Sequence, residues 1–173
     1  VDIVQTVRPY LRKLMEASGE TVHFVERDGT DAVYIDKVES FNNGMQMVSR
    51  IGSRIPLYCS GVGKAMLAQM DSWEAEEVWN ASGVSPLTEH TITDYGKFQQ
   101  ELAQIQQRGY ALDNEENQIG VRCIACSLKD PAGIPKYAFS ISAPTSRMND
   151  ERIRELAFYV LEAGKEMAES LSR

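Results

Sequence analysis

A glycine-rich tetrapeptide, Ser60-Gly61-Val62-Gly63, stands directly before a run with strong helix propensity, Lys64 to Ala68. The first amide groups of a helix have no intrahelical acceptor, and the positive end of the helix dipole also attracts a carboxylate or a phosphate. The pattern therefore offers the backbone amides at this helix start as an anion site. A glycine-bent turn that packs a helix on a sheet has the same composition, and this alternative stays open.

The same junction differs from a nucleotide-binding P-loop. That motif requires glycine where Tyr58 stands and serine or threonine where Ala65 stands. The hydroxyl that would bind magnesium is therefore missing, and we predict no metal and no other cofactor.

Four polar side chains in the second half of the chain form another candidate group. Asp113 ends an apolar run, where a carboxylate can accept hydrogen bonds from the hydroxyls of a ligand. Ser140 and Ser142 lie two residues apart, so in a strand they share one face, and Cys123 can join them in a common polar patch. The alternatives are a solvated acidic loop and ordinary solvent-facing serines.

The three cysteines are Cys59, Cys123 and Cys126, an odd number that argues against a secreted disulfide framework. Residues three apart in a strand point to opposite faces, so Cys123 and Cys126 do not pair easily as zinc ligands. A nucleophilic Cys123 would need a base, and neither His23 nor His90 is near it in sequence. A buried cysteine acting as a small hydrophobe is the simpler interpretation.

The elements that must position these residues follow from apolar spacing and from turn signals. In the first half we expect a helix capped by Asp2 and closed by Gly19, and then a hairpin with a longer loop around Asp28-Gly29. Its strands are predicted at Thr21 to Val25 and Ala32 to Val38. Met45, Met47 and Ile51 suggest a third strand.

In the second half, Asp71 and Glu74 resemble a capping box, and Asp94 opens a further helix that ends at Gly109. The remaining predicted elements are strands at Tyr110 to Asp113, Val121 to Leu128 and Tyr137 to Ser142, and a terminal helix capped by Asn149 or Asp150. Two strand groups around a helical middle predict a single α+β domain over residues 1–173, with a mostly antiparallel sheet flanked by helices. The terminal helices should cover one face of that sheet.

Composition restricts the function further. The chain has 173 residues, of which 43% are apolar, enough for one substantial core. Its net charge of −7 argues against DNA binding by this segment, because phosphate-binding domains are usually basic. No apolar run approaches the ~18 residues of a membrane span. We therefore expect a cytoplasmic protein without a membrane partner, and the start at Val1 without methionine suggests a fragment.

Taken in order, these motifs resemble the C-terminal effector-binding domain of IclR-family bacterial transcription regulators. The resemblance covers nearly the whole chain and includes Gly19-Glu20-Thr21, Pro56 through Ala65, Arg108 through Asp113, Gly120 through Ala125 and Ser140-x-Ser142-x-Pro144. Within the family the chain is similar to the 2-keto-3-deoxygluconate-responsive (KdgR-like) branch. It departs from the family pattern at Tyr58, where many members carry histidine, and at Met45-Gln46-Met47. We expect Tyr58 to alter polarity near the ligand.

The resemblance implies a GAF-like or profilin-like fold that binds a small organic acid and is not an enzyme. It implies a winged helix-turn-helix domain before Val1 that binds DNA, and a homo-oligomer. Carried over residue by residue, the family's ligand site comprises Gly61, Val62, Asp113, Cys123, Ser140 and Ser142. A thiol-dependent enzyme using Cys123 and an oligomerisation module without a ligand are the alternatives.

Overall fold

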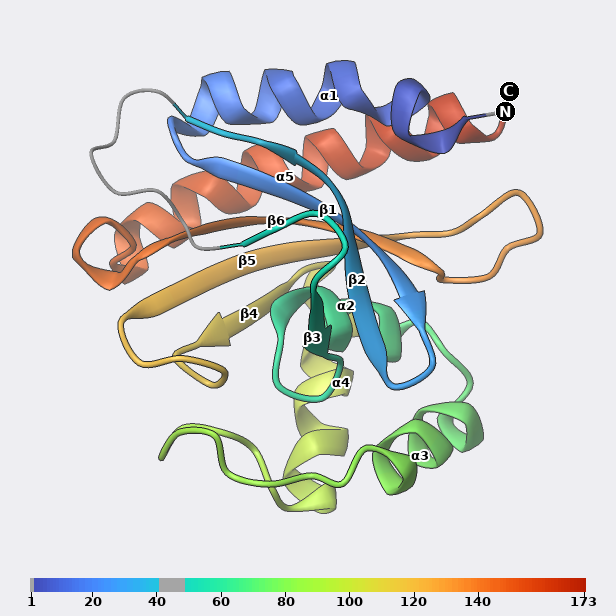
Figure 1. The fold of residues 1–173 in the computed structure, drawn as a ribbon, viewed down its shortest axis with the longest axis vertical. Coiled ribbons are helices and arrows are strands. Elements are labelled where there is room, and N and C mark those ends of the chain that lie inside the picture. The colour runs from blue at the N-terminus through green and yellow to red at the C-terminus, as the bar shows by residue number, and fades with distance from the viewer. Residues whose placement is uncertain (1, 41–48) are drawn as a thin grey trace.

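The computed structural model describes residues 2–40 and 49–173, and within these ranges the chain forms one six-stranded antiparallel sheet with helices on both faces (Figure 1). The strand order is β3-β2-β1-β6-β5-β4. The strands are β1 (Thr21–Asp28), β2 (Asp31–Val38), β3 (Arg54–Pro56), β4 (Ala111–Asn114), β5 (Val121–Leu128) and β6 (Tyr137–Pro144). This arrangement confirms the predicted α+β class.

The helices divide between the two faces of the sheet. The long terminal helices lie together on one face, as predicted, and the shorter central helices lie beyond the other (Figure 1). The helices are α1 (Ile3–Ser18), α2 (Gly61–Ala68), α3 (Ser72–Ala81), α4 (Tyr95–Arg108) and α5 (Asp150–Leu171), with a short 3-10 turn at Thr145–Arg147. Each face therefore has its own apolar core cluster, separated by the sheet.

Helix ends follow the predicted caps closely. The Asp2 carboxylate accepts a hydrogen bond from the Val4 amide at 3.0 Å, and Gly19 ends α1 with φ of 71°. Asn149, and not Asp150, caps α5, since its side chain accepts from the Arg152 amide. These local signals are readable in sequence because a cap involves neighbours only.

Three expectations differ from the structure. The first hairpin is tighter than predicted: β1 extends to Asp28 and β2 begins at Asp31, so the turn has two residues. Asp71 precedes α3 but its side chain makes no capping hydrogen bond. Met45 and Met47 lie outside the described residues, whereas Ile51 stands 65% exposed in a turn and the third strand begins at Arg54.

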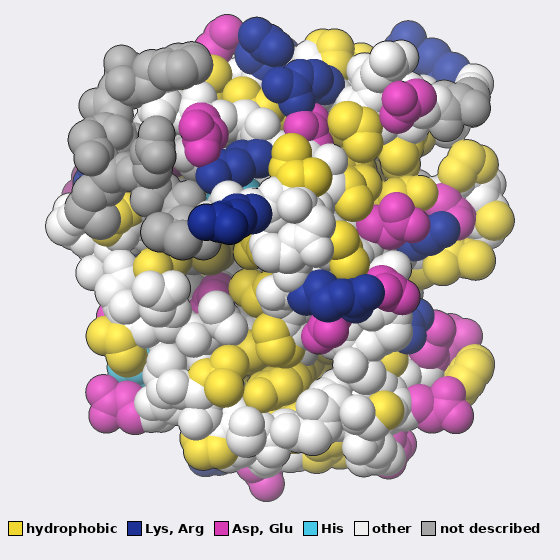
Figure 2. All heavy atoms as spheres, viewed as in Figure 1, with side chains coloured by type: hydrophobic (Ala, Val, Ile, Leu, Met, Phe, Trp, Pro, Cys, Tyr) yellow, Lys and Arg dark blue, Asp and Glu magenta, His cyan; other side chains and the backbone are white. Residues whose placement is uncertain are grey.

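Charged side chains of both signs are spread over the surface. In Figure 2 the basic side chains on the visible face lie among acidic ones. None of the helices in the described ranges is long and apolar enough to cross a lipid bilayer.

Candidate functional site

A cavity of about 600 Å³ opens where β4, β5 and β6 meet the turn after β4, on the face of the sheet that carries α2. Asp113, Cys123 and Ser142 line it from these three strands. Residues of β1, β2 and β3 and of the segment before β3 complete the wall; they include His23, Tyr34, Ser49 and Arg54. Such a concave site with a few convergent polar groups is typical of small-molecule binding.

Strand register brings three of the predicted ligand residues side by side. Asp113 pairs with Cys123 across β4 and β5, and Cys123 pairs with Ser142 across β5 and β6. Directly paired residues in an antiparallel sheet point to the same face. The Cys123 Sγ atom accordingly lies 3.0 Å from the Ser142 Oγ atom. The polar patch predicted from alternation is therefore present.

Ser140 lies two residues before Ser142 on β6, where it pairs with His23 of β1 and Ala125 of β5. It is buried on the same face but is not among the residues that line the cavity. Its role as a ligand residue stays a prediction.

Gly61 begins α2 against this patch. A Cβ atom placed on Gly61 would lie 3.3 Å from the Cβ of Ala125 and 3.6 Å from that of Cys123. The Ser60 Oγ atom accepts a hydrogen bond from the Gly63 amide. The first backbone hydrogen bond of the helix runs from the Lys64 amide to the Ser60 carbonyl. The amides of Gly61 and Val62 therefore precede the intrahelical bonds, as an anion site requires.

Neither Gly61 nor Val62 lines the cavity as it stands, and the Val62 side chain belongs to the apolar core beneath α2. Gly63 holds α2 in place, because a Cβ atom there would lie 2.2 Å from the Leu57 Cα and carbonyl oxygen. This close approach of helix and loop explains why glycine recurs at the junction. The anion site at Gly61 and Val62 remains a prediction.

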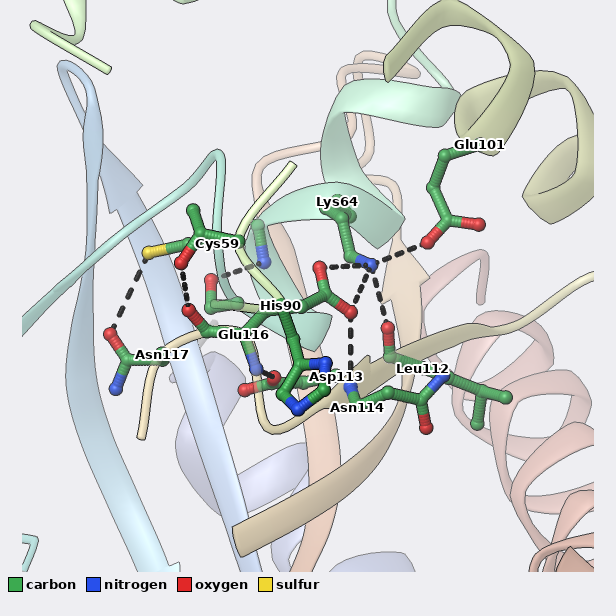
Figure 3. A network of polar contacts seen from close by, with 12 residues as sticks. Cys59, Lys64, His90, Glu101, Leu112, Asp113, Asn114, Glu116 and Asn117 are labelled. Carbon is green, nitrogen blue, oxygen red and sulfur yellow. Dashed lines mark hydrogen bonds and ion pairs between the residues drawn. The ribbon is translucent and has the colours of Figure 1, made fainter. Parts of the chain in front are cut away.

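A buried charge network supports the site from the α2 side, and sequence reasoning missed it (Figure 3). The fully buried Lys64 Nζ atom donates to Glu101 Oε2 at 2.7 Å and to the Leu112 carbonyl at 2.7 Å, and lies 2.8 Å from Glu116 Oε1. Glu116 Oε2 in turn accepts from the Asn114 amide at 3.0 Å. The available signal was one lysine inside the otherwise apolar segment 61–68.

Asp113 is linked to this network through the backbone. The Glu116 amide donates to Asp113 Oδ1 at 2.8 Å, which fixes the carboxyl group at the cavity wall. Burial, together with the neighbouring Glu116 carboxylate, raises the pKa of Asp113 to about 7, although Lys64 and the backbone amides oppose the shift. Asp113 is therefore a carboxyl group that changes charge near neutral pH.

His23 lines the cavity from β1, and sequence reasoning gave it no role. Its Nε2 atom lies 2.6 Å from the Ser49 Oγ atom, while Nδ1 has no hydrogen-bond partner among the described residues. Burial and the positive charge of Lys37 lower the pKa of His23 to about 4, so the imidazole is neutral at pH 7. Its ring packs edge-on against Tyr34, with centroids 5.0 Å apart.

Cys59 is buried, and Cys123 and Cys126 are partly buried. Cys123 faces the cavity, whereas Cys126 lies on the other face of β5, against Gly164 of α5. Burial raises the pKa of both thiols, and the nearby Asp113 carboxyl raises that of Cys123 further. A thiol with a raised pKa is a poor nucleophile at neutral pH. Among the described residues, no group of three or more histidine, cysteine and acidic side chains could hold a metal ion.

Tyr58 corrects one expectation. Its hydroxyl donates to the Ser85 carbonyl at 3.1 Å, and its ring packs edge-on against Trp79. Tyr58 is buried in the core beside α3 and does not line the cavity, so we find no effect on the polarity of the site. The second variable position, Met45-Gln46-Met47, falls outside the described residues.

Comparison with known proteins places this chain in one family. The family model described as bacterial transcriptional regulator IclR C-terminal matches residues 1–173. The acetate operon repressor of Salmonella typhimurium is 38% identical over 168 residues, which cover 96% of this chain and 61% of that protein. The chain thus spans less than two thirds of such a relative.

Solved structures agree with this assignment. The Thermotoga maritima IclR structure has a TM-score of 0.93 and 36% identity, covering 100% of this chain and 70% of that one. The C-terminal domain of the E. coli regulator KdgR has a TM-score of 0.87 and 31% identity, covering 100% of both chains. The KdgR match stands beside other members, so no KdgR-like branch is singled out. The chain is a regulator domain and not an enzyme, and it belongs to the IclR C-terminal family of bacterial transcriptional regulators.

Proposed function

We propose that this chain senses a small organic acid for a transcription regulator, most simply a repressor. A 2-keto sugar acid such as 2-keto-3-deoxygluconate, pyruvate and glyoxylate are the candidate effectors. The observation that carries the proposal is the row of Asp113, Cys123 and Ser142 across three neighbouring strands, all facing one cavity. Separate segments that converge in this way favour ligand recognition over a structural role.

The proposed binding mode divides the ligand between two sets of groups. The carboxylate lies against the amides of Gly61 and Val62, at the positive end of the α2 dipole. Ser140, Ser142 and Asp113 hydrogen-bond a keto or hydroxyl group of the same molecule, and Cys123 lines the wall. An approach to the amides would need a small adjustment, since Gly61 is packed against Cys123 and Ala125.

The output of the sensor is a change in DNA binding by another domain. We propose a winged helix-turn-helix domain preceding Val1, with α1 as its connector. The effector then acts by binding more tightly to one arrangement of the DNA-binding domains than to another. Because α1 packs against α5 and against the sheet whose other face holds the cavity, a shift in the strands can reach it.

Assembly into a homo-oligomer is the second part of the proposal. Phe158 is 65% exposed on α5, and Tyr159 and Leu161 beside it are also exposed. Exposed apolar side chains that gather on one helix favour contact with another protein surface. An oligomerisation module without an effector is the alternative function, because the exposed apolar patch on α5 fits an interface with or without a ligand in the cavity.

A thermal-shift screen of 2-keto-3-deoxygluconate, pyruvate and glyoxylate tests the proposal. We expect a concentration-dependent rise in Tm with at least one acid, because a ligand that binds only the folded chain stabilises it. Ser142→Ala should abolish the rise, whereas Ser127→Ala, the same change on β5 away from the cavity, should keep it. If no acid raises Tm, or if both variants respond equally, the assigned site is wrong.

A further inference from the structure

Two acidic side chains are buried near the cavity, and one of them, Asp113, lines its wall. Asp113 is 3% exposed and Glu116 is 4% exposed, and the amide of Glu116 donates to the carboxylate of Asp113. Neighbouring like charges away from water disfavour ionisation of both groups at once, and the Glu116 carboxylate is one of the groups that raise the pKa of Asp113. One of them must therefore be compensated or protonated.

The nearby cation, Lys64, pairs directly with Glu116 and acts on Asp113 only at longer range. The contacts of Lys64 Nζ go to Glu116, Glu101 and the Leu112 carbonyl (Figure 3). No lysine, arginine or histidine makes an ion pair with Asp113 in the described part of the chain, and the groups that donate hydrogen bonds to it are the backbone amides of Glu116 and Asn117. Asp113 is thus the member of the pair that can gain or lose a proton, because no side-chain cation pairs with it directly.

The other groups that face Asp113 supply no positive charge. They are Cys59 from the turn before α2, Cys123 from β5 and Tyr34 from β2, and burial raises the pKa of each. The remaining cavity-lining bases are His23, which is neutral, and Arg54, which is paired with Asp28 and Asp31. An entering carboxylate therefore finds a site that already contains uncompensated negative charge.

On the basis of the proposed function, we propose that an organic acid binds this cavity together with one proton, which Asp113 takes up from solvent. The neutral carboxyl group then donates a hydrogen bond to an oxygen of the ligand that carries no hydrogen, either a keto or a carboxylate oxygen. No other bond forms or breaks. The effector class is thereby narrowed to acids that present such an oxygen to β4, which favours 2-keto acids over polyols.

The direction of the pH effect follows from linkage. A ligand anion raises the pKa of Asp113 further, so the complex holds a proton that the free chain has lost above neutral pH. The Kd should be nearly constant below about pH 6, where Asp113 is already protonated, and should rise by up to ~10-fold per pH unit above pH 7. The sensor would then respond more strongly to its effector in acidified cells.

The first test needs no ligand. In the free chain, 13C NMR of labelled aspartate carboxyls should show one group that titrates near pH 7 and vanishes in Asp113→Asn. Glu116→Gln removes the neighbouring negative charge and should move this midpoint downward. A midpoint near 4 for Asp113 overturns the inference whatever the chain binds.

The second test uses isothermal titration calorimetry with pyruvate, glyoxylate and 2-keto-3-deoxygluconate between pH 6 and 8.5, in two buffers of different ionisation enthalpy. We expect uptake approaching one proton at pH 8, and neither uptake nor pH dependence in Asp113→Asn. Glu77→Gln, on the exposed surface of α3, should behave like the unmodified chain.

The outcomes separate the two proposals. Binding without proton uptake overturns the proton-linked mode and leaves the acid-sensing function in place. Binding of none of the acids at any pH overturns the proposed function, while the NMR titration still decides the charge of Asp113. Uptake that persists in Asp113→Asn assigns the proton to another group and refutes the inference.

Discussion

Replacing Asp113 by asparagine should stabilise the folded chain, and should do so more at alkaline than at acidic pH. The folded state raises the pKa of this carboxyl from 3.8 to about 7, so the folded chain binds the proton more tightly than the unfolded chain. The stability that this proton binding contributes to the folded chain is therefore lost as the pH rises from about 4, and the loss is complete above about 7.

The magnitude follows from the size of the shift. A pKa raised by about three units destabilises the folded state by about 4 kcal/mol above pH 7, but by only about 1.5 kcal/mol at pH 5. Asparagine removes the charge, and its carboxamide oxygen can still accept from the Glu116 amide. The gain in the free energy of unfolding should therefore be about 3 kcal/mol larger at pH 8.5 than at pH 5.

Urea unfolding of the unmodified chain, Asp113→Asn and Glu77→Gln at these two pH values measures the difference. Glu77 is exposed on α3, so its replacement controls for the loss of one acidic group in general. An equal effect of Asp113→Asn at both pH values would show that Asp113 is ionised normally in the folded chain. The electrostatic account of the site would then fail, because burial beside Glu116 would have no consequence.

Four further predictions address the elements around the site. Lys64→Met should cost about 3 to 5 kcal/mol in urea unfolding, and adding Glu116→Gln should recover part of it, because a buried carboxylate is left without its cation. Gly63→Ala should lower Tm sharply in circular dichroism melts, since its Cβ meets loop backbone at 2.2 Å. Iodoacetamide at pH 8 should label Cys123 slowly in the folded chain and quickly in urea, as mass spectrometry would show; fast native labelling would contradict the raised pKa of this thiol. Between pH 6.5 and 4, His23 lowers the free energy of unfolding by up to about 3 kcal/mol, because the histidine of the unfolded chain is protonated at higher pH than that of the folded chain; His23→Leu should abolish this contribution.

The elements that sequence predicted well are those fixed by near neighbours. Asp2, Gly19 and Gly109 mark helix ends through contacts within a few residues, and the alternation around Cys123 predicts which face it occupies. Strand pairing then follows for β5 and β6, whose short connection leaves an antiparallel ladder as the simple solution.

The contacts that could not be predicted from the sequence depend on the order of the strands in the sheet. β1 lies between β2 and β6, which brings His23 beside Ser140 although 117 positions separate them in the numbering. The partners of Lys64 come from α4 and from the turn after β4, and neither can be chosen before the sheet order is known. A lone lysine in an apolar helix indicates that buried partners must exist, but not which ones they are.

The two titrating groups that line the cavity, His23 and Asp113, have opposing effects on stability. As the pH rises from 4 to 6.5, the folded chain gains stability because His23 is neutral in it, and loses stability because Asp113 is protonated in it. The two slopes nearly cancel, so a flat profile for the unmodified chain over this range does not show that either pKa is ordinary. Each substitution leaves only the other group to titrate. From pH 4 to 6.5, the Asp113→Asn variant should therefore become more stable and the His23→Leu variant less stable. The cavity wall can therefore hold two strongly perturbed groups whose effects on the free energy of unfolding offset each other between pH 4 and 6.5.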